Sequence, residues 1–292
     1  LDNLQNFGDQ FATELAETKR RLMESIDATE VYPKRSPRGE KQNPELIHVG
    51  YIVNSVYDGE FMPFFEGIIR HHDPSNFRSF VYQQSITENA LHVQLKNQAH
   101  SLRPIYDMDL ETLSVIMIND RLDVLVDLSG TSDGHQYALL KQDVAPLVTG
   151  ALKSPFGFDI PQYNFVISDS VTSKSDKKKL HKGAKSISLK RPLYAMEPPE
   201  HIVYTSPSPA KSSGFVTFGA TWDMLVLTPE GIALYAEILK SAPNSRLCLG
   251  NVPQITASVQ ERILDQFKFL EVGDRISFSN AGDHDLNPRI EF

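Results

Sequence analysis

The chain has 292 residues, 40% of them hydrophobic, and a formal net charge of -8. This length supports one or two globular domains, no apolar run reaches the roughly 20 residues needed to span a bilayer, and the acidic balance argues against nucleic-acid binding. One cysteine excludes an internal disulfide and, with no signal-peptide pattern at the start, predicts an intracellular, reducing compartment, the cytoplasm or an organelle interior.

The amino-terminal segment predicts an amphipathic helix within residues 1–30. Apolar side chains recur there at helical spacing: Leu4, Phe7, Phe11, Leu15, Leu22 and Ile26. We expect this apolar face to pack on the protein's own core, with docking to a partner as the alternative. Residues 31–46 carry three prolines and several charges without apolar periodicity, which predicts a linker or extended arm.

A globular lobe is predicted over residues 47–190, because strand-like and helix-like apolar runs alternate there. The expected strands cover residues 47–53, 77–83 and 122–128, and the expected helices cover residues 62–71 and 110–119. This alternation predicts an α/β fold with a doubly wound parallel sheet. Ligands of such sheets bind at the carboxyl ends of the strands, so functional residues are expected in the loops that follow them.

Residues 174–191 form the densest basic run, which we expect to be a solvated loop. Its cationic residues are Lys174, Lys177, Lys178, Lys179, Lys182, Lys185, Lys190 and Arg191. Such a run attracts acidic partners, but it lacks the aromatic residues that stack on bases. His71 and His72, beside Asp73, have no third ligand at a metal-site interval, so no metal site is expected.

The segment over residues 214–250 reads GFVTFGATWDMLVLTPEGIALYAEILKSAPNSRLCLG and predicts a strand, a helix and a second strand. Thr228 is the expected helix cap, and Pro229 fills the first helical position, where no amide hydrogen bond is lost. The order predicts a right-handed crossover in a second parallel sheet, with its ligand-facing turn at residues 219–227. A helix over residues 259–267 and a strand over residues 275–278 follow.

Four stretches carry the pattern of one family. They are VGYIVNSVYDGEFMPFFEGIIRHHDPSNFRSFVYQ from Val49, LSVIMINDRLDVLVDLSGTSDG from Leu113, DVAPLVTGALKSPFGF from Asp143, and the segment over residues 214–250. Together they resemble the catalytic region of glycosyltransferase family 41, the O-GlcNAc-transferase family, over about residues 47–280. The resemblance implies a GT-B-like fold: a first Rossmann-like lobe, a Pro-rich connection over residues 191–213 and a partial second Rossmann-like lobe over residues 214–292.

The same resemblance implies a UDP-sugar donor and no other cofactor, but several functional positions are substituted. Two histidines of the family's HPxxH motif fall on Gly59 and Pro63, a proposed acid/base histidine on Ile118, and the lysine that meets the donor phosphates on Val226. A valine neutralises no phosphate charge. If the chain is active, the catalytic candidates are Tyr57, Asp58, Thr131, Ser132 and His135, and the donor-binding candidates are Trp222 and Asp223.

Three functions stay open at this point. The substitutions favour a degenerate relative that serves as a protein-binding or scaffolding module, through the amino-terminal helix, the Pro-rich arm or the basic loop. The alternative is an active nucleotide-sugar-dependent protein O-glycosyltransferase. A remote alternative is a serine hydrolase, because residues 130–134 match GxSxG after a strand, with Asp169 and His181 or His201 as partners.

The resemblance stops before the family's nucleotide-binding half. Two explanations fit this extent: the chain is a fragment of a longer protein, or its gene lost that half. Because that half holds the nucleotide in the resembled family, its loss would add to the expectation of a degenerate donor site, whereas in a fragment it would belong to the longer protein.

Overall fold

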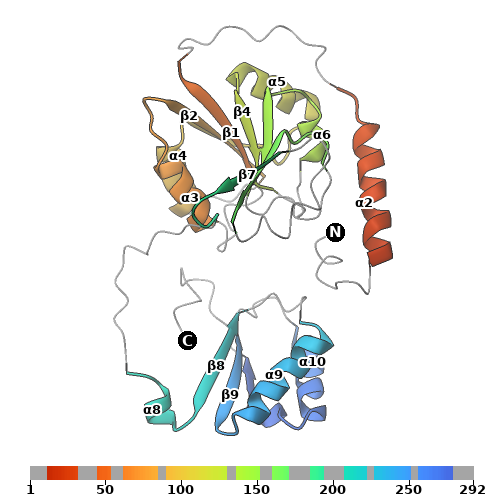
Figure 1. The fold of residues 1–292 in the computed structure, drawn as a ribbon, viewed down its shortest axis with the longest axis vertical. Coiled ribbons are helices and arrows are strands. Elements are labelled where there is room, and N and C mark those ends of the chain that lie inside the picture. The colour runs from red at the N-terminus through yellow and green to blue at the C-terminus, as the bar shows by residue number, and fades with distance from the viewer. Residues whose placement is uncertain are drawn as a thin grey trace. The chain divides into compact units, whose positions relative to one another are not determined.

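The computed structural model describes residues 12–31, 45–53, 62–84, 90–129, 136–151, 160–170, 185–193, 207–221, 227–250 and 256–278. The contacts divide the chain into two compact units, built mainly on residues 13–198 (unit 1) and 199–292 (unit 2). Figure 1 shows the elements of each unit. The finer domain boundaries expected from the sequence stay predictions. Among the described residues, no helix is long and apolar enough to cross a membrane.

Unit 1 contains a seven-stranded parallel sheet in the order β3-β2-β1-β4-β5-β6-β7. Its strands are β1 (Ile47–Val53), β2 (Phe77–Gln83), β3 (Ser101–Pro104), β4 (Val124–Asp127), β5 (Leu147–Gly150), β6 (Phe165–Asp169) and β7 (Lys185–Leu189). The first six strands follow the 3-2-1-4-5-6 order of a Rossmann sheet, whose switch point lies between β1 and β4. The predicted doubly wound parallel sheet is confirmed.

Helices cover both faces of this sheet, so the central strands β1, β2 and β4 are buried over most of their length. The helices are α2 (Ala12–Asp27), α3 (Met62–Arg70), α4 (Ala90–Gln98), α5 (Leu110–Asp120) and α6 (Tyr137–Leu140). On one face, Leu113 and Met117 of α5 share a core with Ile52 of β1. On the other face, Phe65 of α3 and Leu95 of α4 pack with Val53 of β1. Figure 1 shows α3 and α4 on the side of the sheet away from α5 and α6.

Helix α2 contacts unit 1 through its last turns. Ile26 is buried in the core beneath α5 and α6, and Leu22 and Met23 pack against that core. The Nζ of Lys141 donates to the backbone oxygens of Ile26 at 3.2 Å and of Thr29 at 2.9 Å. The carboxyl-terminal half of the apolar stripe is therefore used within this protein; docking of α2 to a partner stays a prediction.

The basic run contains an edge strand, so the predicted solvated loop is wrong for residues 185–189. These residues form β7, which pairs along its whole length with β6, from Phe165 opposite Lys185 to Asp169 opposite Leu189. All five are exposed, as expected of an edge strand that carries charge. Residues 174–184, which hold five of the lysines, lie outside the described part of the chain. The sequence also gave no expectation of α4 or β3.

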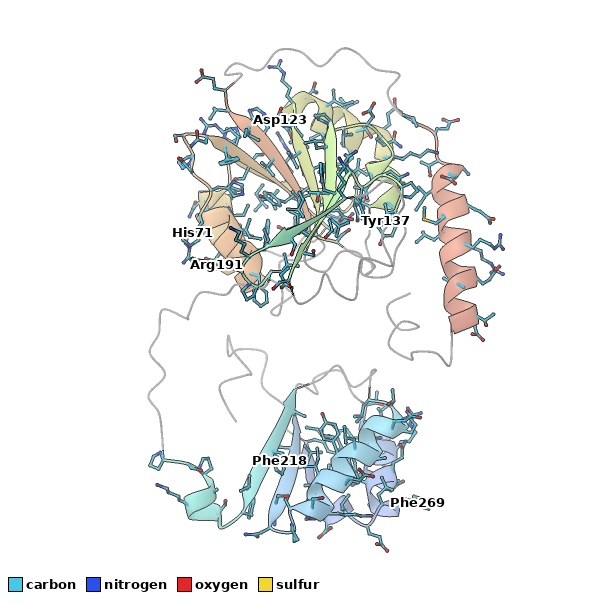
Figure 2. The ribbon with its side chains drawn as sticks, in the orientation of Figure 1. His71, Asp123, Tyr137, Arg191, Phe218 and Phe269 are labelled. Atoms are coloured by element: carbon cyan, nitrogen blue, oxygen red, sulfur yellow. The ribbon has the colours of Figure 1, made fainter. Side chains whose placement is uncertain are left out.

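Unit 2 contains a three-stranded parallel sheet in the order β10-β9-β8, half of a Rossmann sheet. Its elements are α8 (Ala210–Ser213), β8 (Val216–Thr221), α9 (Pro229–Ser241), β9 (Ser245–Gly250), α10 (Ala257–Phe269), η3 (Gly273–Arg275) and β10 (Ile276–Phe278). The Oγ1 of Thr228 accepts from the Gly231 amide at 3.2 Å and caps α9 as expected. Ile232, Phe267 and Leu249 join one core, whereas Phe269 points outward (Figure 2).

Candidate functional site

The carboxyl ends of β1 and β4 form the ligand-facing edge at the switch point of unit 1. The two strands are in register from Val49 opposite Val124 to Ile52 opposite Asp127, and the Leu128 amide donates to the Ile52 carbonyl at 3.0 Å. The loops that follow are residues 54–61 and 130–135, so they begin side by side. The catalytic candidates lie in these loops, outside the described residues: Tyr57, Asp58, Thr131, Ser132 and His135.

A buried carboxylate holds the end of β4 and the residues just before the loop over residues 130–135. Asp127 is fully buried, and its Oδ1 accepts from the amide and the hydroxyl of Ser129 at 2.9 and 2.6 Å. Its Oδ2 accepts from the Tyr163 hydroxyl at 2.5 Å. Tyr163 lies 36 residues from Asp127, so no local pattern in the sequence links the two. The short Asp-x-Ser spacing at the strand end was the available signal, because such side chains bond to the backbone two residues on.

A second buried carboxylate, Asp169 at the end of β6, also has a structural partner. Its Oδ2 accepts from the Leu193 amide at 2.8 Å and thereby holds the segment after β7. Asp169 is the residue that a serine-hydrolase triad would use. The other members of that triad, Ser132 with His181 or His201, lie outside the described residues. Nothing in the described geometry favours the hydrolase.

One substituted position proves to be at the other end of the sheet. Ile118 lies in the last turn of α5, which leads into the amino end of β4, and its side chain packs against the core of unit 1. A crossover helix runs antiparallel to its strands, so this turn lies opposite the ligand-facing edge. The interpretation of Ile118 as an emptied acid/base position is therefore wrong. Gly59 is not described, and Pro63 lies in the first turn of α3.

The corresponding edge of unit 2 lies after β8. Strand β8 ends at Thr221, opposite Gly250 of β9, and α9 begins after its cap Thr228. The turn between them is the first strand-to-helix turn of a parallel sheet, where anionic ligands of such folds bind. Trp222, Asp223 and Val226 fall in this turn, outside the described residues.

His72, the second residue after α3, serves the local structure. The Nε2 of His72 lies 2.6 Å from the Tyr51 hydroxyl, and its ring packs edge-on against Phe77. Burial lowers the pKa of His72, so the imidazole is neutral near pH 7. The carboxylate of Asp73 accepts from Ser75 and Asn76 in the turn that follows. No group of three metal-ligating side chains occurs among the residues that the structure describes.

Comparison with curated proteins finds sequence relatives among plant proteins; no family model matches the chain. The probable UDP-N-acetylglucosamine–peptide N-acetylglucosaminyltransferase SPINDLY of Solanum lycopersicum is 25% identical over 239 residues, which cover 80% of this chain and 26% of that protein. SPINDLY of Arabidopsis thaliana is 25% identical over 241 residues, which cover 81% and 26%. The chain thus spans about a quarter of the length of these relatives.

Solved structures share the fold. A mutant of the Thermobaculum terrenum O-GlcNAc transferase matches with a TM-score of 0.71 at 20% identity, over 88% of this chain and 48% of that chain. A glycosyltransferase from Rickettsia africae ESF-5 matches with a TM-score of 0.51 at 10% identity, over 82% and 70%. The sequence relatives, the strand order and these matches agree with the motif pattern. The chain carries a catalytic region like that of glycosyltransferase family 41, the O-GlcNAc-transferase family, in a GT-B-like fold.

Proposed function

We propose that this O-GlcNAc-transferase-like region keeps the fold without transferring sugar, and that it serves as a protein-binding scaffold. The observation that carries the proposal is Val226, an apolar residue where the family pattern has its phosphate-binding lysine. This position belongs to the turn between β8 and α9 of a parallel sheet. A donor diphosphate leaving from such a turn needs a cation or a cradle of amides, and valine supplies no charge.

The expected loss is large even if the other sites are intact. Removing one preorganised group that stabilises developing charge typically lowers kcat by about 10²- to 10³-fold. Gly59 and Pro63 stand in the places of two imidazoles, and a positioned general acid or base contributes about 10²- to 10⁴-fold. Ile118 lies at the opposite edge of the sheet and adds nothing to this expected loss of rate. The proposal rests on Val226, Gly59 and Pro63.

Donor turnover tests the proposal. The purified chain, incubated with UDP-N-acetylglucosamine and a Ser/Thr-containing peptide, should release no more uridine diphosphate than a sample without protein. The Thr131→Val and Trp222→Ala variants should give the same background, because neither candidate then takes part in a reaction. Release at a rate that either substitution abolishes would restore the active-transferase reading.

The scaffolding half of the proposal is supported by the edge of unit 1. Strand β7 exposes Ile187 (45%) and Leu189 (39%) on the outermost strand of the sheet. Lys190 and Arg191 follow directly, and Figure 2 shows Arg191 on this side of unit 1. An edge strand binds an extended segment through its main chain, and the flanking charges fit an acidic one. The described residues contribute no strand beyond β7.

Charge reversal tests this surface. Lys190→Glu combined with Arg191→Glu should weaken binding of a labelled peptide of alternating glutamate and valine by about tenfold or more, because like charges then face each other. Lys240→Glu combined with Lys268→Glu makes the same charge change in unit 2 and should leave the affinity unchanged. Equal losses from both double variants, measured by fluorescence anisotropy, would show that only net charge matters.

A further inference from the structure

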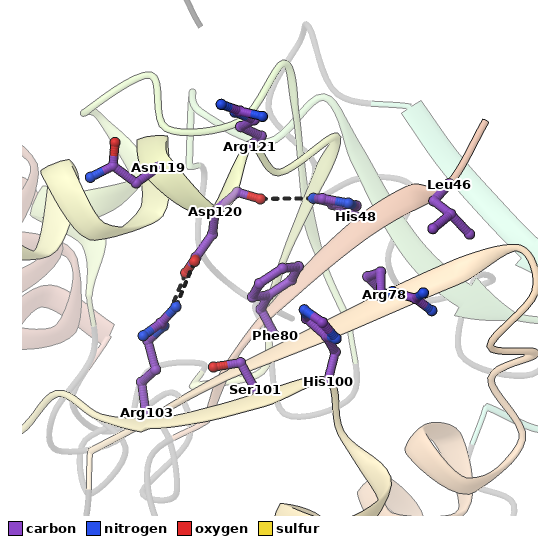
Figure 3. A pocket seen from close by; sticks show the side chains of 10 residues that line it. All are labelled: Leu46, His48, Arg78, Phe80, His100, Ser101, Arg103, Asn119, Asp120 and Arg121. Atoms are coloured by element: carbon purple, nitrogen blue, oxygen red, sulfur yellow. Dashed lines mark hydrogen bonds and ion pairs between the residues drawn. The ribbon is translucent and has the colours of Figure 1, made fainter. Parts of the chain in front are cut away.

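A pocket of about 690 Å³ opens at the amino-terminal edge of the unit 1 sheet, opposite the edge of the candidate site. Neighbouring strands supply its lining near their first residues: His48 of β1, Arg78 and Phe80 of β2, and Ser101 and Arg103 of β3. The end of α5 closes it with Asn119, Asp120 and Arg121 (Figure 3). The sheet order brings together segments that lie far apart in the sequence, and three arginines and two histidines meet at one site.

The acidic side chain in this lining is already paired. Asp120 is buried, and Arg103 donates to it twice, from Nη2 at 2.7 Å and from Nε at 3.1 Å. The Tyr82 hydroxyl donates to the same carboxylate at 2.7 Å. A two-bonded arginine and a hydroxyl satisfy a carboxylate well. Asp120 therefore offsets Arg103 and leaves the charge of Arg78 uncompensated within the lining.

Three side chains keep donors or ring nitrogens without a described partner. Arg78 donates from Nη1 to the carbonyls of Pro74 at 2.7 Å and Phe77 at 3.4 Å, and the described bonds leave its Nη2 and Nε open. His48 uses Nδ1 at 2.8 Å from the Asp120 carbonyl. A carbonyl only accepts, so the proton is on Nδ1, and Nε2 becomes a donor when the ring is protonated. His100 stacks edge-on against Phe80 with no described bond from its ring nitrogens.

The electrostatic field in the pocket is positive. The pKa of His100 is lowered first by burial and then by the charges of Arg78 and His48, with a smaller contribution from Arg103, and only Asp120 acts in the opposite direction. The carbonyls at the end of α5 would repel an anion, but two of them are taken: Ile118 accepts from the Arg121 amide, and Asp120 from His48. Asp123, which follows, is occupied by the His48 amide at 2.7 Å.

We propose that this pocket binds an anion of the phosphate class, the phosphoryl group of a small metabolite or of a phosphorylated peptide. Arg78 is the main ligand through its open guanidinium nitrogens, and the ring nitrogens of His48 and His100 complete the site. Because the pocket lies at the edge of the unit 1 sheet opposite the loops that hold the catalytic candidates, binding here is separate from any chemistry in those loops. The proposal therefore holds whether the chain is an enzyme or a scaffold.

Titration with sodium sulfate, followed by the NMR signals of the histidine rings, tests the pocket on the whole chain. Sulfate stays doubly charged across the range, so any change of affinity with pH comes from the protein. An anion favours a protonated imidazole, so its affinity should rise as the pH falls from about 7.5 to about 5.5 and His100, whose pKa is lowered first by burial, begins to take up a proton. The other charged side chains around these rings are Arg103, Arg121 and Asp120 of the lining and Asp123, which binds the His48 amide.

Arg78→Gln should weaken sulfate binding by about tenfold, because it removes a charge-assisted pair of hydrogen bonds. Arg78→Lys keeps the positive charge but loses the planar guanidinium group. Its sulfate affinity should lie between those of the unchanged protein and Arg78→Gln. Arg262→Gln removes the same charge from α10 of unit 2 and should change nothing. Circular dichroism confirms that each variant is folded. Absence of saturable binding, or equal weakening by Arg78→Gln and Arg262→Gln, would overturn the proposal.

Two further ligands distinguish the natural source of the phosphoryl group. Phosphoserine that binds as tightly as a phosphoserine peptide indicates a small metabolite, since the peptide's extra atoms then add nothing. A peptide that binds about tenfold tighter than phosphoserine indicates a phosphorylated protein segment. In both cases Arg78→Gln should weaken binding of the phosphorylated ligand.

Discussion

Replacing Phe267 with alanine should unfold unit 2 while unit 1 keeps its structure. Phe267 is 0% exposed and belongs to a core of nine buried residues in the described part of unit 2. Truncating a buried phenylalanine costs about 3–5 kcal/mol of unfolding free energy. A whole domain has about 5–15 kcal/mol, and a core this small lies toward the lower end. Hydrogen–deuterium exchange should show the amides of β9 losing protection while those of β1 retain it.

Phe269→Ala is the matched control, because it makes the same change two residues further along α10. Phe269 is 87% exposed, so its loss should alter the free energy of unfolding by no more than about 0.5 kcal/mol. If the β9 amides exchange at the same rate in the Phe267→Ala and Phe269→Ala variants, burial does not govern the stability of unit 2. If β1 loses protection together with β9, the two units unfold as one.

Asp127→Ala should destabilise unit 1 by about 3 kcal/mol or more, since it removes the acceptor of several buried hydrogen-bond donors. Asp127 accepts from the Ser129 amide, the Ser129 hydroxyl and the Tyr163 hydroxyl, and all three residues are buried. Each buried donor left without an acceptor costs about 1–3 kcal/mol. Urea titration followed by the exchange of the β1 and β5 amides measures the loss in unit 1 alone.

Tyr163→Phe distinguishes the loss of one hydrogen bond in this network from the loss of the whole network. It removes one donor but leaves Asp127 its two bonds from Ser129, so the expected cost is about 1 kcal/mol. An Asp127→Ala cost no greater than that of Tyr163→Phe would contradict the structural role. The prediction matters for function because the loop with Thr131 and Ser132 begins at this network.

The parts of the fold that the sequence predicted have strong local signals. Strands β1 and β2 match their expected bounds, because each is a seven-residue segment rich in β-branched and aromatic residues. The cap at Thr228 and Pro229 located the start of α9. In contrast, β3 has only four residues, and β7 has the polar sequence KSISL. Strand β7 exists through its pairing with β6, and no local preference in a basic run predicts a pairing partner.

The candidate site divides in the same way. Topology alone predicts that the loops after β1 and β4 lie together, and the register of these strands agrees. The placement of Ile118 could not be read from an aligned motif, because the direction of α5 decides which edge its last turn reaches. The pocket around Arg78 was missed entirely. His48, Arg78, Arg103 and Asp120 come from four elements and meet only through the 3-2-1-4 strand order.

Calorimetric titration with uridine diphosphate tests the central claim, a family fold without a working donor site, most directly. The Arg78→Gln variant should be titrated in parallel. Any diphosphate binding in the pocket around Arg78 is then recognised because this variant loses it. We expect the Arg78→Gln variant to show no saturable binding heat at micromolar uridine diphosphate, because Val226 offers no charge to the phosphates. Micromolar binding that persists in Arg78→Gln and is lost in Trp222→Ala would contradict the claim.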